Sequence, residues 1–129
     1  MKEIIIDTNV FVRFLIKDVL FQFEKARKVF DKIEKGEIKG LVSILVVNEV
    51  VWILENFYEL KRGIYIPKLL QLLLLKNLKI IEVKKSLIIN TLQRMEKQKF
   101  DFTDLYLSQI ADARKVFSFD KDLKKTSKE

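Results

Sequence analysis

Four carboxylates are the residues of this chain best suited to chemistry: Asp7, Glu49, Asp104 and Asp120. Carboxylates packed together repel one another and raise one another's pKa unless divalent cations neutralise them. Hard oxygen ligands favour Mg²⁺ or Mn²⁺ over zinc. If the four side chains converge, we expect them to hold one of these ions, which suits chemistry on phosphate esters.

The residue types that are missing narrow the choice further. The sequence has no cysteine and no histidine. Disulfides, thiolate metal sites, imidazole bases and imidazole ligands are therefore excluded. Chemistry must come from carboxylates, lysines, hydroxyls or a metal ion held by oxygen atoms.

Each acid also has a structural interpretation, and taken singly that interpretation is the simpler one. Asp7 could cap the helix that begins after it, and Asp104 could be a favourable charge near a helix N-terminus. Asp101 has the spacing of a capping residue for the helix that carries Asp104, and we assign it that role. Asp120 and Asp122 could be turn residues that follow a strand.

Glu49 fits a structural role least well. Its neighbours in VVNEVVWI are nearly all apolar, which predicts a helix buried on most sides. An ionised carboxylate there costs several kcal/mol unless it is paired or bound to a cation. A metal ion would satisfy it, and an Arg or Lys from elsewhere in the chain would do so too.

The elements that must position these acids alternate along the chain. Short apolar runs at 4–6, 39–42, 79–83 and 116–119 predict strands, and helical spacing or capping residues predict helices at 10–16, 21–34, 43–57, 67–76, 86–97 and 101–113. We expect Gly63 to end the third helix and Pro67 to lie in the first turn of the fourth. Such alternation predicts an α/β fold, three-layer α/β/α with a central parallel sheet of about four to five strands. We find no linker or repeat and expect a single domain over residues 1–129.

This order of elements brings the four acids to one edge of the sheet. Asp7 and Asp120 directly follow predicted strands, and ligands of parallel sheets bind beyond the carboxyl ends of the strands. Glu49 and Asp104 lie near the starts of helices, which begin at that same edge.

The positive charge is concentrated in the middle of the chain. Residues 61–99 hold 10 Lys/Arg against 2 Asp/Glu, whereas the whole chain has a net charge of +7. Solvated lysine-rich helices and a footprint for a phosphate backbone both explain this excess. The N-terminus has no signal-peptide pattern and the apolar stretch 69–75 is too short to span a membrane, so we expect a cytoplasmic protein without membrane contact.

The blocks that carry the acids, in their order, resemble the PIN-domain family, specifically the VapC-like toxin ribonucleases. The resemblance covers nearly the whole chain. It rests on IIIDTNVFVRFLIKD, VVNEVVWILENFY, FDFTDLYLSQIA and FSFDKDLKK, which contain Asp7, Glu49, Asp104 and Asp120 respectively. Two departures concern the last block: the chain ends seven residues after Asp122, and Asp112 to Lys115 lacks a glycine often seen before the last core strand. Asp122 could therefore stand in for Asp120.

The resemblance implies an endoribonuclease that depends on Mg²⁺ or Mn²⁺ and hydrolyses RNA phosphodiesters with metal-activated water. It implies the four acids as catalytic residues and metal ligands, with Thr8, Asn9 and Ser118 as candidate supporting or phosphate contacts. It further implies the toxin of a VapBC-type toxin–antitoxin pair, as a homodimer neutralised by a small antitoxin protein. A catalytically silent PIN module that binds RNA or protein, and a housekeeping RNA-processing PIN nuclease, are the alternatives.

Overall fold

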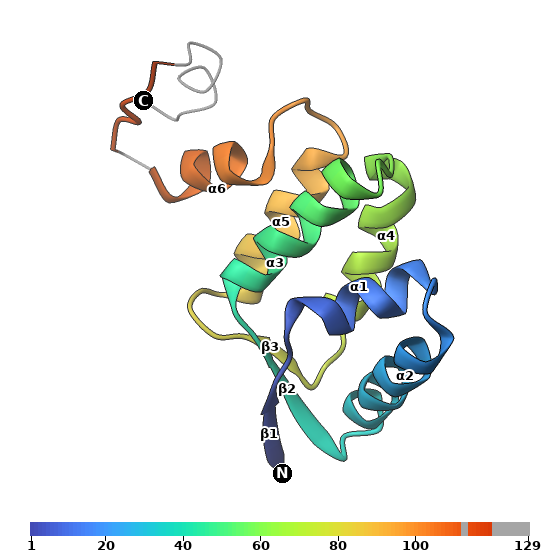
Figure 1. Cartoon of the computed structure of the whole chain (residues 1–129). Helices are drawn as coiled ribbons and strands as arrows, with labels where there is room; N and C mark the ends of the chain where they lie inside the picture. The colour runs from blue at the N-terminus through green and yellow to red at the C-terminus, as the bar shows by residue number, and fades with distance from the viewer. Residues whose placement is uncertain (112–113, 120–129) are drawn as a thin grey trace.

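A three-stranded parallel sheet lies at one end of the molecule (Figure 1). The computed structural model describes residues 1–111 and 114–119. Its strands are β1 (Lys2–Ile5), β2 (Ile38–Val42) and β3 (Leu78–Ile80), in the order β1-β2-β3. Ile4 pairs with Gly40 and Val42 pairs with Ile80, both in parallel register. The carboxyl ends of the strands therefore meet at one edge, as expected.

Helices make up most of the remaining described chain and flank the sheet. They are α1 (Thr8–Ile16), α2 (Leu20–Glu34), α3 (Ile44–Trp52), the π-helical turn η1 (Ile53–Phe57), α4 (Arg62–Leu73), α5 (Lys85–Met95) and α6 (Phe102–Ala111). Helix α2 packs against β2, α4 packs against β3, and α5 packs against both α4 and α6. The predicted α/β class with a parallel sheet flanked by helices is confirmed.

Gly40 allows α2 to approach the middle strand closely. A Cβ atom at this position would lie 2.6 Å from Cδ1 of Ile33, which is completely buried. Real Cβ atoms do not come so near another carbon, so a side chain here would force the buried Ile33 side chain to move within the packed contact between α2 and β2. The residue thus serves packing, which the sequence pattern alone did not indicate.

The middle of the chain corrects two expected helix boundaries. Ser43 caps α3 as predicted, because its side chain accepts a hydrogen bond of 3.1 Å from the amide of Leu45. Gly63, however, lies inside α4 and does not end the preceding helix, which gives way at η1. Pro67 also lies within α4, beyond its first turn. A local breaker signal was outweighed here by burial of Tyr65, Ile66 and Leu69 on the core side of α4.

The expectation of a strand at 116–119 is wrong. These residues form no strand and lie beyond α6, away from the sheet (Figure 1). Phe117 and Phe119 contact each other edge to face at 5.6 Å and are 85% and 95% exposed. A short apolar run predicts burial but not a pairing partner, so it does not by itself specify a strand. The described sheet therefore has three strands, fewer than expected.

Within the described residues, no helix is both long enough and apolar enough to cross a membrane.

Candidate active site

Asp7 lies at the carboxyl edge of the sheet, where β1 ends and α1 begins. It is the residue before α1, with extended backbone (φ −84°, ψ 164°), and its side chain makes no capping hydrogen bond. The Asp7 side chain therefore does not cap α1, and the structural interpretation of Asp7 does not hold. Its carboxylate is exposed and faces solvent at this edge.

Thr8 connects the start of α1 to Glu49 on α3. The Thr8 hydroxyl donates a short hydrogen bond to Oε1 of Glu49, and Thr8 itself is only 4% exposed. The contact therefore joins the start of α1, next to Asp7, to the helix of Glu49. Thr8 was expected as a supporting contact, and this hydrogen bond is consistent with that role.

The expected burial of Glu49 is wrong. Glu49 is exposed, whereas Val47, Val50, Val51 and Leu54 form the buried face of the same helical segment. The outward face carries Glu49 together with exposed Leu45 and Trp52. An exposed carboxylate has no desolvation penalty that a metal must offset, so the argument from burial falls away and the argument from position remains.

Asp104 lies in the first turn of α6, where it is half-buried. Its amide donates a hydrogen bond of 2.9 Å to Oδ1 of Asp101, the capping contact predicted from the sequence. The far end of α6 is tied to α5, because Gln109 donates to the Thr91 hydroxyl at 2.5 Å and accepts from Asn90 at 2.5 Å. Both ends of the helix that carries Asp104 are thus held in place.

The structure gathers only part of the expected cluster. Thr8, the residue after Asp7, contacts Glu49, and Asp104 lies on a helix that packs against α3. Among residues 1–111 and 114–119, however, no group of three or more acidic side chains is close enough to hold a metal ion. Asp120 and Asp122 lie outside the described residues. The oxygen donors match Mg²⁺ or Mn²⁺ in kind, but the described geometry supplies an incomplete ligand set.

Glu82 is a further carboxylate at this edge that the sequence analysis missed. It follows β3 and accepts from the Ser43 hydroxyl at 2.6 Å and from the Ile44 amide at 2.8 Å. The hydrogen bond from Ser43, followed by that from Ile44, lowers the pKa of Glu82. Glu82 therefore caps α3 across the sheet and sets where Glu49 lies. Its signal was an acid directly after an apolar strand, the same signal that identified Asp7.

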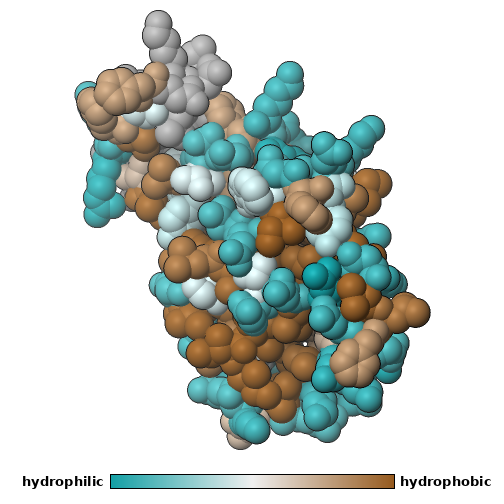
Figure 2. All heavy atoms as spheres, in the orientation of Figure 1, coloured by the Kyte–Doolittle hydropathy of each residue, from teal (hydrophilic) through white to brown (hydrophobic). Residues whose placement is uncertain are grey.

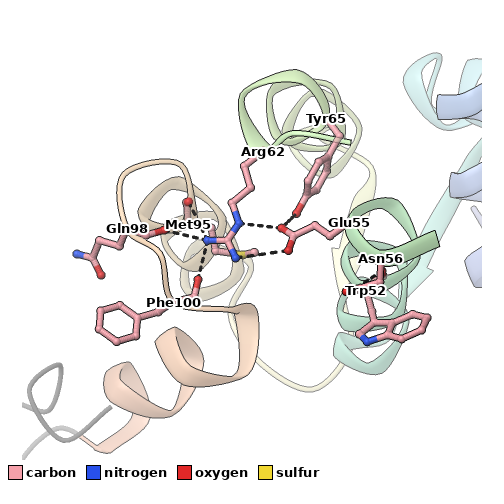
Figure 3. Close-up of polar contacts among 8 residues, drawn as sticks. All are labelled: Trp52, Glu55, Asn56, Arg62, Tyr65, Met95, Gln98 and Phe100. Atoms are coloured by element: carbon pink, nitrogen blue, oxygen red, sulfur yellow. Dashed lines mark hydrogen bonds and ion pairs between the residues drawn. The ribbon is translucent and has the colours of Figure 1, made fainter. Parts of the chain in front are cut away.

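Arg62 fastens the loop that leads into α6 (Figure 3). Its guanidinium donates to the carbonyls of Met95 at 3.2 Å, Gln98 at 2.9 Å and Phe100 at 2.7 Å. Its Nε donates to Glu55 at 2.8 Å. This arrangement, the Arg62 clamp, joins the start of α4, the turn η1 and the loop before Asp101. No local pattern in the sequence reveals it.

Tyr65 completes the Arg62 clamp from the α4 side. Its hydroxyl donates to Oε2 of Glu55 at 2.5 Å (Figure 3). Burial, and then the hydrogen bond to Glu55, raise the pKa of Tyr65 far above its ordinary value. Tyr65 therefore stays protonated and remains a donor, which keeps both oxygens of Glu55 engaged with the clamp.

Asn9, another expected supporting residue, points to a different surface. It lines a groove of about 260 Å³ between α1 and α2, together with Arg13 and Lys25. The Nε of Arg13 is buried and has no hydrogen-bond partner within the described part of the chain. Ser118 lies in the segment beyond α6 and not at the sheet edge.

Comparison with known proteins adds one finding. Residues 4–129 match a family model described as PIN domain. No curated protein and no solved structure matches the chain.

Proposed function

The chain belongs to the PIN-domain family, whose members are generally nucleases, and on that premise we propose that it is an endoribonuclease dependent on Mg²⁺ or Mn²⁺. The observation that supports the proposal is the hydrogen bond to Glu49 on α3 from Thr8, the residue after Asp7 at the carboxyl end of β1. Ligands of parallel sheets bind at this edge.

The roles of the residues follow from their positions. Asp7 offers carboxylate oxygens from the residue before α1, Glu49 from the second turn of α3 and Asp104 from the first turn of α6. Thr8 holds one oxygen of Glu49 and so restricts its rotation. A bound divalent ion would neutralise these carboxylates and lower the pKa of a water at the phosphodiester. Asp120, and Asp122 as its substitute, remain proposed fourth ligands.

The chemistry is tested by the Asp7→Asn variant, which keeps the size of the side chain and removes its charge. We expect RNA cleavage in Mg²⁺ or Mn²⁺ to fall at least about 100-fold, as for loss of a group needed in the transition state. Mn²⁺ binding, measured by calorimetry, should weaken in parallel. Asp31→Asn, an acid on α2 paired with Arg27, is the control and should cleave like wild type. Equal cleavage by the Asp7→Asn variant would refute the assignment.

The biological setting is a separate proposal: a cytoplasmic toxin of a VapBC-type pair, acting as a homodimer and bound by a small antitoxin. Exposed apolar side chains support a protein partner. Ile5 on β1 is 70% exposed, Leu20 73% and Phe21 71%, and Figure 2 shows apolar side chains gathered over the sheet end of the face in view. Contiguous exposed apolar surface, as on the face in Figure 2, often marks protein interfaces. Molar mass in solution and co-purification with the product of the adjacent gene test both partners.

A catalytically silent PIN module is the second candidate. It is favoured by one observation: the described residues hold no group of three acids within reach of a single ion. Such a module should bind RNA equally well with and without Mn²⁺ and should not cleave it. The metal titration therefore separates the two candidates independently of the mutational test.

A further inference from the structure

A cavity of about 310 Å³ lies between the helix of Glu49 and the helix of Asp104. It opens beside α3 and η1 on one side and the start of α6 on the other. Its lining comes from Asn48, Val51, Trp52, Glu55, Asn56, Asp101, Phe102 and Thr103. Asn48 precedes Glu49, and Thr103 precedes Asp104, so the cavity adjoins both proposed metal ligands.

Trp52 lines the cavity, yet its side chain is not buried in the core. It lies one helical turn after Glu49 on the outward face of α3, and it is 62% exposed. A large aromatic ring that stays exposed gives up the free energy that burying its apolar surface would supply, unless the ring is covered by a ligand or partner. Figure 3 shows Trp52 and Asn56 next to each other where α3 continues into η1. The side-chain amide of Asn56 donates a hydrogen bond of 3.1 Å to the carbonyl of Trp52, which fixes the adjoining turn.

The remaining lining suits a nucleobase better than a phosphate. No lysine or arginine lines the cavity, and its charged residues are Glu55 and Asp101. Both oxygens of Glu55 are already engaged by the Arg62 clamp, whereas Asp101 uses Oδ1 for the amide of Asp104 and has further acceptor capacity. Carboxylates and carboxamides pair with the amino and ring N–H groups of bases. Anionic phosphates would be repelled here.

We propose that this cavity, the Trp52 subsite, binds a base of single-stranded RNA next to the scissile phosphate, with the base stacked on the Trp52 indole. The inference rests on the proposed ribonuclease function. Single-stranded RNA is recognised largely by stacking unpaired bases on aromatic side chains, which a duplex does not offer. The subsite would thus select unpaired RNA and place its backbone toward Glu49 and Asp104.

The test uses Trp52 as its own reporter, because it is the single tryptophan of the chain. A short single-stranded RNA of mixed sequence, added in the presence of EDTA so that metal-dependent cleavage stops, should quench its fluorescence. A duplex of the same sequence should quench it much less. The Trp52 variants lack this tryptophan, so their binding is followed by the fluorescence anisotropy of a dye-labelled RNA, with wild type measured in the same way. Trp52→Ala should weaken single-strand binding roughly 5- to 150-fold, the equivalent of 1–3 kcal/mol per stacked base. Trp52→Phe should retain most of the binding.

Leu45→Ala is the matched control, since Leu45 is 75% exposed on the same helix but does not line the cavity. It should bind RNA like wild type, and circular dichroism should show all three variants folded. Unchanged fluorescence, or equal binding by Trp52→Ala and wild type, would overturn the subsite. So would a loss of dimer mass in Trp52→Ala with RNA affinity unchanged, which would assign the surface to a second copy. Quenching without any metal-dependent cleavage would instead keep the subsite and reject the proposed chemistry.

Discussion

Glu49 illustrates how a side chain is assigned from its sequence neighbours and from its helix face. The apolar letters around it predicted burial, yet the buried residues Val47, Val50 and Leu54 recur at helical spacing and leave Glu49 on the opposite side. Exposed Leu45 and Trp52 share that side and obscure the period. The start of α3 after β2 was therefore predictable, whereas the exposure of Glu49 was not.

The hydrogen bond from Thr8 to Glu49 predicts that the Thr8 hydroxyl contributes to metal binding. Thr8→Val keeps the shape of the buried side chain but removes the donor. Glu49 would then rotate more freely, and we expect Mn²⁺ affinity and RNA cleavage to fall about 10- to 100-fold, the usual effect of losing a group that orients a ligand.

Thr8→Ser separates this role from simple packing. Serine restores the donor and loses only a methyl group, so metal affinity and cleavage should return most of the way to wild type. The measurements are Mn²⁺ calorimetry and initial cleavage rates. If Thr8→Val binds Mn²⁺ like wild type, Thr8 has a packing role only.

Among the helices and strands, features that depend on residues close in sequence could be predicted, whereas contacts between distant residues could not. The caps at Ser43 and Asp101 could be predicted because donor and acceptor lie within three residues. The Arg62 clamp could not, because it joins residues 33 to 38 positions apart. The segment at 116–119 shows the converse, since its local apolar pattern resembles a strand and nothing local supplies a partner.

The Arg62 clamp should matter more to stability than surface ion pairs do. Arg62→Lys removes the planar fork that reaches Glu55 and the carbonyls of the loop before α6. Side chains of Arg62 and Glu55 are 23% and 22% exposed, so lost hydrogen bonds are only partly replaced by water. We expect the free energy of unfolding to drop by about 2 kcal/mol.

Arg27→Lys is the matched control for the clamp. Arg27 pairs with Glu24 and Asp31 on one exposed helix face. Replacing it by lysine should therefore change the free energy of unfolding by less than about 0.5 kcal/mol. Both variants are measured by chemical denaturation. Cleavage by Arg62→Lys should also decrease because the start of α6 carries Asp104. Equal destabilisation by the two variants would argue against the clamp.

For the whole molecule, the structure divides the basic residues of 61–99 into internal and external ones. Arg62 is used by the clamp, and Lys85 donates 2.9 Å to the carbonyl of Leu75, where burial lowers its pKa. Neither is available to bind RNA. The exposed basic residues of this stretch are Lys61, Lys68, Lys76, Lys79, Lys84, Lys97 and Lys99. Lys97 and Lys99 lie in the loop before α6, between the residues that the Arg62 clamp holds. Most of the basic excess is therefore external, and it is spread along 61–99 rather than gathered at one point.

The loop before α6 leads into the helix of Asp104, so its two exposed lysines predict how RNA binding responds to salt. Each phosphate contact on single-stranded nucleic acid contributes about 0.7 to the slope of log affinity against log salt concentration. The double variant Lys97→Gln/Lys99→Gln should therefore reduce that slope by about 1.4 and weaken binding most at low salt. The double variant Lys32→Gln/Lys35→Gln removes two exposed charges near the C-terminal end of α2, which leads to the amino end of β2. Because that end of the strand is opposite the Asp7 edge, the salt slope of this second double variant should equal that of wild type. Equal slopes for both double variants would mean that the RNA backbone does not pass the loop before α6.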